Sequence, residues 1–393
     1  MIDYNKALSD KVKKMKPSGI RKFFDIAATK KDVISLGVGE PDFSTPWAIR
    51  KSAINTLERK KIIYGANKGI EILRDAICTY INKKYGVQYN SEDEVIVTVG
   101  GSEAIDLSIR ALIDPGDEVL VVEPSFVCYS PLVELVGGVA VPVPTRIENN
   151  FKLTPEDLEG KITDKTKLLI LPFPNNPTGA VMTKEDLEKI ADVIRDTNII
   201  VLSDEIYSEL TYGRKHYSII QIDGMRERTI YVNGFSKAYA MTGWRLGYLT
   251  APKEIVSQLV KIHQYGIMCS PFISQNAAVE ALNSCENEVK KMVSEYDTRR
   301  RFLVKELNRI GLECFSPEGA FYVFPCIKST GLSSEEFCER LLDEENVACV
   351  PGNAFGECGE GFIRISYAYS LKHLTEAVSR MENFVNKIKA EQK

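Results

Sequence analysis

Histidine is scarce in this sequence. The 393 residues include three histidines, His216, His263 and His373, which are far apart in the chain. A Ser-His-Asp triad, or a metal site with several histidine ligands, needs such side chains to converge. We therefore expect any acid-base chemistry to depend on other residue types.

Strong net charge and long apolar runs are also absent. The chain has 50 Lys and Arg and 54 Asp and Glu residues, which give a formal net charge of −4 with neutral histidines. This balance offers no electrostatic basis for binding nucleic acid or an anionic membrane. No uncharged apolar stretch reaches the roughly 18 residues that a membrane span requires, and the N-terminus has no apolar signal-peptide core.

Cys-x-x-Cys pairs are missing among the nine cysteines. Most of these cysteines lie within apolar runs such as Ala348–Val350. The pattern predicts reduced core residues of a cytoplasmic protein rather than disulfides or metal ligands.

Short apolar runs do occur, and they alternate with helical patterns over about residues 95–250. Near-continuous Val, Ile and Leu runs followed by Gly, Asp or Pro indicate strands that are buried on both faces of a mostly parallel α/β sheet. The seven runs are Val95–Val99, Val119–Val122, Val139–Val143, Leu168–Leu171, Ile199–Leu202, Ile230–Val232 and Leu246–Leu249. Thr183 and Ser102 are predicted to open two of the helices.

The sequence changes character after about residue 284. A long charged helix is expected over Glu286–Arg309, and a last helix over about Leu371–Ile388. Short strands are expected around Phe321–Phe324, Val347–Val350 and Phe362–Ser366. We predict an N-terminal segment, 1–45, that contributes to the small domain, a large domain over 46–284, and a smaller α+β domain over 285–393.

Two segments follow buried strands and carry reactive side chains. Lys237, after the run that ends near Asn233, could be desolvated and so become a good Schiff-base former, or it could be an ordinary surface lysine. Asp204 lies at the carboxyl end of a strand, where α/β sheets bind ligands, with Tyr207 three residues later. A carboxylate there can keep a heteroaromatic nitrogen protonated, although Asp204 could instead cap a helix.

Three other segments suit the binding of anions. Gly100 and Gly101 join a strand to a helix, where free amides suit a phosphate, although a simple tight turn has the same pattern. Asn176, held before Pro177, could donate to an oxygen or serve only a turn. Arg364 lies within an apolar strand, so its guanidinium needs an anion, either a ligand carboxylate or a structural ion-pair partner.

Together these segments resemble the class I and II aminotransferases, which are fold type I enzymes that use pyridoxal 5′-phosphate, and most closely the prokaryotic aspartate aminotransferase subgroup. The resemblance covers residues 17–388 and keeps the family's order of motifs. The matching segments are Gly37–Phe43, Tyr64–Gly69, Gly100–Ala104, Asn176–Gly179, Asp204–Tyr207, Ser236–Arg245 and Arg364.

The resemblance implies a catalytic role for Lys237, which would bind the cofactor as a Schiff base and shuttle the substrate proton. Asp204 would pair with the pyridinium nitrogen, while Tyr207 and Asn176 would bond the ring O3′. By the same resemblance, further positions bind the cofactor or the substrate. Phe126 would stack on the cofactor ring. The phosphate would be held by the amides of Gly101, Ser102 and Glu103 together with Arg245 and Ser236, and Tyr64 would reach the phosphate of the neighbouring subunit. The substrate carboxylate would be bound by Arg364, Gly39 and Asn176.

Two positions depart from the family pattern. Many relatives carry a serine three residues before the lysine as a phosphate ligand, whereas this chain has Gly234. Some aspartate-using relatives carry a lysine, for the distal carboxylate of the substrate, where this chain has Ser102. The resemblance therefore implies more reliance on other phosphate ligands and gives no support to dicarboxylate specificity.

We predict a homodimeric, ping-pong aminotransferase that moves an α-amino group from an L-amino acid to a 2-oxo acid such as 2-oxoglutarate. The Thr211–Ser218 and Ser18–Arg21 segments resemble those of broad-range enzymes, so aspartate, an aromatic amino acid and an acyl-diaminopimelate-type amino acid remain candidate donors. A fold type I C–S β-lyase and a non-catalytic sensor domain on the same fold remain alternatives.

Overall fold

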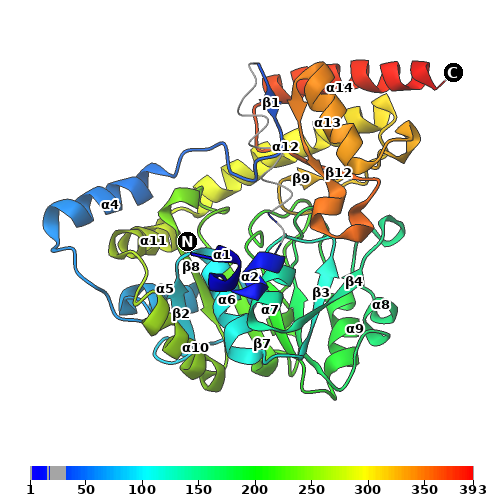
Figure 1. Cartoon of the computed structure of the whole chain (residues 1–393). Helices are drawn as coiled ribbons and strands as arrows, with labels where there is room; N and C mark the ends of the chain where they lie inside the picture. Colours follow the sequence, from blue (N-terminus) through cyan, green and yellow to red (C-terminus); the bar gives the residue numbers. More distant parts are fainter. Residues whose placement is uncertain (1, 16, 18–31, 393) are drawn as a thin grey trace.

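A seven-stranded sheet forms the centre of the large part of the molecule (Figure 1). The computed structural model describes residues 2–15, 17 and 32–392, so the Ser18–Arg21 segment lies outside the described residues. The strands are β2 (Val95–Thr98), β3 (Glu118–Glu123), β4 (Val139–Pro144), β5 (Thr166–Leu171), β6 (Ile200–Asp204), β7 (Thr229–Gly234) and β8 (Gly247–Thr250).

The strand order is β2-β8-β7-β6-β5-β3-β4, and all neighbours pair in parallel except those of β8, which is antiparallel to β2 and β7. Every predicted run forms a strand, and the predicted mostly parallel α/β fold is confirmed. Successive side chains enter different apolar clusters, Val95 and Val97 on one face and Ile96 on the other, because a strand alternates its side chains. Burial on both faces explains why the runs are continuously apolar.

Helices cover both faces of this sheet. One face packs against α6 (Gly100–Leu112), α7 (Tyr129–Val136) and α10 (Lys253–Gly266). The remaining helices of this part are α4 (Trp47–Arg59), α5 (Glu71–Tyr85), α8 (Pro155–Glu159), α9 (Lys184–Ile194) and α11 (Phe272–Ser284). The predicted cap at Thr183 is confirmed, because its side chain and that of Asp186 form a capping box at the start of α9.

The predicted start of α6 at Ser102 is wrong by two residues. The helix begins at Gly100, directly after β2. Gly100 has a φ of +78°, a backbone conformation that favours glycine, and it allows the chain to turn from the strand into the helix without a loop. The Glu103 carboxylate then accepts a hydrogen bond from the Val99 N–H at 2.5 Å, which supplies a cap that a serine side chain was expected to provide.

The C-terminal part has its own small sheets and three helices, with α14 at the outer edge of the molecule (Figure 1). The helices are α12 (Glu286–Ile310), α13 (Ser334–Glu345) and α14 (Leu371–Glu391). The strands are β9 (Tyr322–Val323), β10 (Val347–Ala348), β11 (Val350–Pro351) and β12 (Ile363–Ser366), and β1 (Ile34–Ser35) pairs in parallel with β10. The N-terminal segment therefore reaches the C-terminal part of the chain.

Short elements complete the chain. Helices α1 (Tyr4–Ala7) and α2 (Asp10–Lys14) precede the undescribed segment. Single-turn 3-10 helices occupy Ile147–Asn149, Ile219–Gln221, Arg226–Arg228, Thr242–Trp244, Lys328–Thr330, Gly352–Phe355 and Glu357–Gly359. In the described ranges, no helix combines the length and the apolar character needed to cross a membrane.

Candidate functional site

A cavity of about 710 Å³ opens at the carboxyl ends of the central strands. It gathers most of the predicted site residues, which come from β-strand ends, the start of α6 and strand β12. Those that line the cavity are Gly39, Gly101, Ser102, Phe126, Asn176, Asp204, Tyr207, Ser236, Lys237, Arg245 and Arg364. Glu103 and Tyr64 do not line it. This edge of a parallel sheet is where open α/β folds bind ligands.

Lys237 reaches the cavity from the turn that follows β7. Its Nζ donates a hydrogen bond of 2.6 Å to the Gly39 carbonyl oxygen. Burial lowers the pKa of the Lys237 amine to about 8, although the nearby Glu40 carboxylate opposes this shift. An amine with that pKa has a large neutral fraction near physiological pH, which makes it a nucleophile and a base.

Asp204 ends strand β6 and is 7% exposed. One carboxylate oxygen accepts a hydrogen bond from the Tyr129 hydroxyl at 2.7 Å, and the other accepts the Ile206 N–H at 3.2 Å. Burial raises the pKa of Asp204, while these two donors oppose the rise. Because a turn rather than a helix follows Asp204, the interpretation of this residue as a helix cap is wrong.

Arg364 lies on β12 and is 3% exposed. Its Nη1 donates to Asn176 Oδ1 at 2.8 Å and its Nη2 donates to the Gly37 carbonyl at 2.5 Å, whereas its buried Nε has no partner. Within the described residues Arg364 forms no ion pair, so the structural ion-pair interpretation is not supported. A buried cation that lacks an anionic partner is suited to receive a ligand carboxylate.

Aromatic side chains surround this arginine. The Arg364 Cζ lies 4.5 Å from the centroid of the Tyr322 ring, and the Tyr322 hydroxyl lies 2.9 Å from the Tyr207 hydroxyl. A Cβ atom on Gly39 would lie 2.2 Å from the Tyr322 hydroxyl oxygen. Gly39 is therefore required for the close approach of its backbone to Tyr322.

The opposite end of the cavity is formed by the first turn of α6 and by Arg245. The N–H groups of a first helical turn have no partner within the helix and attract anions. Arg245 has a φ of +51°, and its Nη1 donates to the Thr242 carbonyl at 2.9 Å. A Cβ atom on Gly100 would lie 2.6 Å from Arg245 Nη2, so glycine leaves room for the guanidinium.

Gly234 lies where strands β7 and β8 pair opposite Gly247. A Cβ atom at Gly234 would lie about 3.0 Å from Ile206 Cδ1 and 3.1 Å from Gly247 Cα. A side chain at this position would require its neighbours to move. The departure from the family pattern noted in the sequence therefore has a packing reason.

The two predicted residues outside the cavity behave differently from each other. The Glu103 carboxylate does not line the cavity, and it forms a hydrogen bond of 2.6 Å with His263 Nδ1. Only the backbone of Glu103 is left for the predicted role. Tyr64 is 80% exposed on the loop after α4, and it faces solvent in the single chain.

Tyr129, Tyr322 and Glu40 also line this cavity and contact or influence the predicted site residues, although no site role was predicted for them. Tyr129 holds Asp204, Tyr322 covers Arg364 and Tyr207, and Glu40 influences Lys237. Glu40 lies beside Gly39 in a segment that the sequence had singled out, so its neighbour was a usable signal. The two tyrosines had none, because their roles depend on the direction of the side chain.

Comparison with known proteins gives a consistent result. A family model for aminotransferase class I and II matches residues 31–381. The chain is 48% identical over 386 residues to an aspartate aminotransferase of Pyrococcus abyssi, covering 98% of this chain and 99% of that relative. It is 46% identical over 386 residues to aromatic-amino-acid aminotransferase 2 of Thermococcus litoralis, with the same two coverages.

A solved structure agrees with these relatives. The crystal structure of an aromatic aminotransferase from Pyrococcus horikoshii matches with a TM-score of 0.90 and 46% identity, and the match covers 93% of this chain and 99% of that chain. Both the predicted fold and the predicted transaminase class are confirmed by these matches. The chain belongs to the class I and II aminotransferase family.

Proposed function

We propose that this transaminase uses pyridoxal 5′-phosphate bound to Lys237 to transfer the α-amino group of an L-amino acid to a 2-oxo acid such as 2-oxoglutarate. The observation that carries the proposal is the position of the Lys237 amine, with its lowered pKa, in one cavity with the Asp204 carboxylate and the Arg364 guanidinium. The amine can react with the cofactor aldehyde, the Asp204 carboxylate can pair with the cofactor ring nitrogen, and the guanidinium can bind the substrate carboxylate.

The cavity fits such a cofactor at each end. Arg245 and the first turn of α6 form a cationic and N–H-rich end for the phosphate, and Gly100 keeps room for the arginine. Phe126 lines the cavity and offers an aromatic face, and Asp204 lies at the end of strand β6 for the ring nitrogen. Tyr207 and Asn176 would approach the ring hydroxyl. The bound cofactor would supply the electron sink that stabilises a carbanion at the substrate Cα.

The chain's own residues would bind the substrate and move its proton. Arg364 would hold the α-carboxylate through its guanidinium fork, with Asn176 Oδ1 fixing the orientation of that fork. Lys237, once released from the cofactor, would take the Cα proton and return it, because its lowered pKa leaves part of the amine neutral near physiological pH and so able to accept a proton. This assignment needs no histidine in the cavity.

We propose an aromatic or other uncharged side chain for the preferred donor. Among the described residues that line the cavity, the cationic groups are Lys237, Arg245 and Arg364, and each has a task that does not involve the side chain of the substrate. Glu40 adds a negative charge that disfavours a distal carboxylate. The relatives carry both names, aspartate for the Pyrococcus abyssi protein and aromatic amino acids for the Thermococcus protein, so the proposal depends on the charges of the cavity.

A half-reaction screen tests this proposal. The purified protein, loaded with pyridoxal 5′-phosphate, is mixed with each amino acid in the absence of a 2-oxo acid, and the loss of the visible absorption band is followed. Phenylalanine and tyrosine should discharge the band faster than aspartate. Faster discharge by aspartate would refute the donor preference, and failure of every amino acid would refute the cofactor-dependent mechanism.

A C–S lyase is the alternative that shares the same lysine and carboxylate. Incubation with cystathionine separates the two reactions, because a lyase releases pyruvate without a 2-oxo acid acceptor. A transaminase should form no pyruvate under that condition. Sustained pyruvate formation at the rate of the amino-transfer reaction would favour the lyase.

We also propose that the chain forms a homodimer through a surface around α4. Large apolar side chains are exposed on α4, the loop that follows it, the start of α5 and the end of α10. They are Trp47, Ile54, Leu57, Ile62, Ile63, Tyr64, Ile72, Tyr265, Ile267 and Met268. Asn67 Nδ2 donates to the Met268 carbonyl at 2.8 Å, so the two halves of this α4 surface adjoin. Exposed apolar surface of this extent is typical of an interface.

We further propose a cytoplasmic location. All nine cysteines are free thiols in the structure, including the buried pair Cys338 and Cys349, whose sulfur atoms lie 3.5 Å apart. Cysteines that serve as buried apolar side chains rather than as disulfides are typical of proteins from a reducing compartment.

A further inference from the structure

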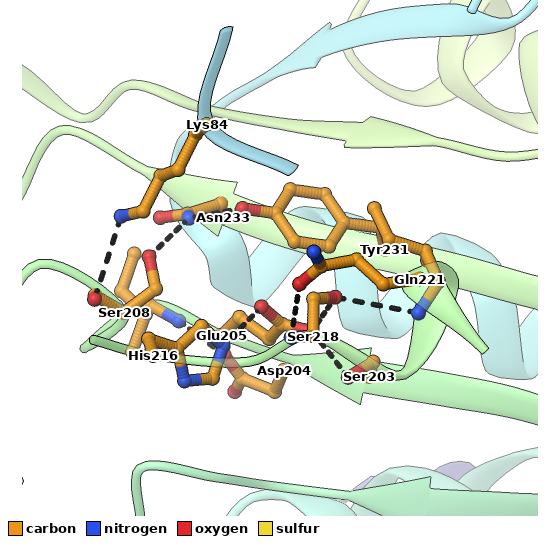
Figure 2. Close-up of polar contacts among 12 residues, drawn as sticks. Lys84, Ser203, Asp204, Glu205, Ser208, His216, Ser218, Gln221, Tyr231 and Asn233 are labelled. Carbon is orange, nitrogen blue, oxygen red and sulfur yellow. Dashed lines mark hydrogen bonds and ion pairs between the residues drawn. The ribbon is translucent and has the colours of Figure 1, made fainter. Parts of the chain in front are cut away.

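Directly behind Asp204, the structure contains a second buried carboxylate that the proposed function does not use. Glu205 is 1% exposed, and its side chain lies on the opposite side of the β6 end from the cavity. Figure 2 shows it surrounded by polar side chains beneath strand β7. Ser203 Oγ donates to Glu205 Oε1 at 3.0 Å, and Ser218 Oγ donates to the same oxygen at 2.5 Å.

The remaining oxygen of Glu205 contacts a histidine. His216 Nε2 lies 2.5 Å from Glu205 Oε2, and the two side chains are 5% and 2% exposed. A carboxylate that already accepts two hydroxyl donors takes the histidine N–H as a third donor. The other ring nitrogen of His216 has no hydrogen-bond partner, so Glu205 is the one hydrogen-bonded partner of that ring in the described part of the chain.

The other ionisable groups near Glu205 are either paired elsewhere or uncharged. Lys84 forms an ion pair with Glu209 at 2.6 Å and donates to the Ser208 carbonyl. Tyr85 and Tyr231 face Glu205 from α5 and β7 with buried hydroxyls, and burial raises the pKa of both well above the ordinary value, so they add no charge near neutral pH. His216 is therefore the group that meets the Glu205 carboxylate beyond the two serine hydroxyls.

The contact between His216 and Glu205 matters because Asp204 directly precedes Glu205 in the chain. The charge of Glu205 raises the pKa of Asp204, whereas the Tyr129 and Ile206 donors lower it. Two buried carboxylates in succession repel one another unless one of them is neutralised. A protonated Asp204 would no longer hold the ring nitrogen of the cofactor by charge.

We propose that Glu205 and His216 are positioning residues for Asp204: they hold the end of β6 in place, and the hydrogen bond from His216 stabilises the Glu205 carboxylate so that Asp204 keeps its own charge for the cofactor ring. The inference rests on the proposed cofactor role of Asp204. It also assigns a task to His216, one of the three histidines, although that residue lies outside the cavity.

A rescue experiment tests the inference. Cofactor-free protein is titrated with pyridoxal 5′-phosphate by fluorescence, and the visible absorption of the loaded protein is followed against pH. His216→Leu should weaken cofactor binding by up to about tenfold, since a nearby carboxylate that has lost its donor shifts a carboxyl pKa by about one unit. The pH at which the visible absorption band of the loaded protein changes should rise in this variant, because a cofactor ring that is less protonated withdraws less electron density from the cofactor imine.

The second substitution distinguishes charge from packing. In the His216→Leu background, Glu205→Gln removes the charge that needs compensation, so binding should return to within about threefold of the wild-type value. A purely structural role predicts that the double variant binds as weakly as the single variant or more weakly. His216→Gln, which keeps an N–H donor for Glu205, should lose less affinity than His216→Leu, and Glu205→Gln should rescue it in the same way if the leucine variant fails to fold.

A matched control is the exposed histidine of α14. His373 contacts Ser370 Oγ at the surface, so His373→Leu should leave both readouts unchanged. Wild-type protein that does not bind the cofactor would overturn the proposed function together with this inference. Wild-type binding without rescue by Glu205→Gln would overturn the inference alone.

Discussion

At the scale of single residues, the reactivity of Lys237 is set by opposing neighbours. Burial, together with the charges of Arg364 and Arg245, lowers its pKa to about 8 against the opposing effect of Glu40 and Asp204. The neutral amine that attacks an aldehyde predominates above the pKa, so capture of pyridoxal 5′-phosphate by the cofactor-free protein should accelerate as the pH rises through about 8. Stopped-flow absorbance measures this capture.

Glu40→Gln removes a charge that raises the pKa of Lys237, so the midpoint of the capture profile should move to lower pH, by roughly one unit or less. Glu40→Asp, which keeps a carboxylate, is the matched control and should stay near the wild-type midpoint. A shift to higher pH in the glutamine variant would show that Glu40 does not act on the lysine through its charge.

Arg364→Gln should separate substrate binding from cofactor capture. Loss of a charged fork that contacts a carboxylate costs about 3 kcal/mol, which corresponds to an increase of about 100-fold in KM for the amino donor. Because the positive charge of Arg364 lowers the pKa of Lys237, the capture midpoint should move to higher pH, opposite to the effect of Glu40→Gln. Steady-state kinetics and the capture profile check the two effects, and an unchanged KM would place the carboxylate site elsewhere.

The sequence could predict residues whose chemistry is fixed by their place in the chain. Lys237 and Asp204 follow buried strands, so their position at the sheet edge follows from the strand pattern. Tyr129 and Glu205 could not be predicted in the same way. Tyr129 has to meet a residue 75 positions away, and Glu205 differs from Asp204 only in the side of the strand end to which it points.

At the scale of elements, strands were more predictable than helix starts. A strand buried on both faces must be apolar throughout, which leaves a continuous signal such as Val119–Val122. The start of α6 gave a misleading signal, because Ser102 is a good capping residue in isolation. The Glu103 carboxylate and the positive φ of Gly100 supply that cap instead, and neither is apparent from local preference alone.

The glycine pair at this start provides a matched comparison. Gly100→Ala should destabilise the protein by about 1–2 kcal/mol, because alanine is strained at a φ of +78° and its Cβ would lie 2.6 Å from Arg245 Nη2. It should also weaken phosphate binding by displacing that guanidinium. Gly101→Ala meets its nearest atoms at 3.7 Å and 3.9 Å, so its stability should stay within about 1 kcal/mol of the wild type. Thermal unfolding measures the stability of the two variants, and titration with inorganic phosphate measures their phosphate binding. Equal effects of Gly100→Ala and Gly101→Ala would contradict the special role of Gly100.

At the scale of the whole molecule, the cavity joins segments that are distant in the chain. Gly39, Lys237 and Arg364 meet there although more than 300 residues separate the first from the last. The sequence predicted the large sheet and the short C-terminal strands, whereas the domain boundaries at 45 and 284 stay a prediction. The net charge of −4 does not describe the cavity. Three cationic side chains, Lys237, Arg245 and Arg364, line it together with the two acidic side chains Glu40 and Asp204.

The α4 surface can be tested as the dimer interface by placing charges on it. Ile54 and Leu57 lie one helical turn apart on α4 and are 44% and 57% exposed, so Ile54→Glu with Leu57→Glu should place two charges in the interface while the folded monomer keeps its core. Burial of each such side chain contributes about 1.5–3 kcal/mol, so the double variant should sediment as a monomer at concentrations where the wild type is a dimer. Leu371→Glu, at a similarly exposed position on α14, is the control and should remain dimeric. The monomer should also bind pyridoxal 5′-phosphate more weakly if Tyr64 completes the partner's site. A double variant that dimerises as tightly as the Leu371→Glu protein would show that the α4 surface is not the interface.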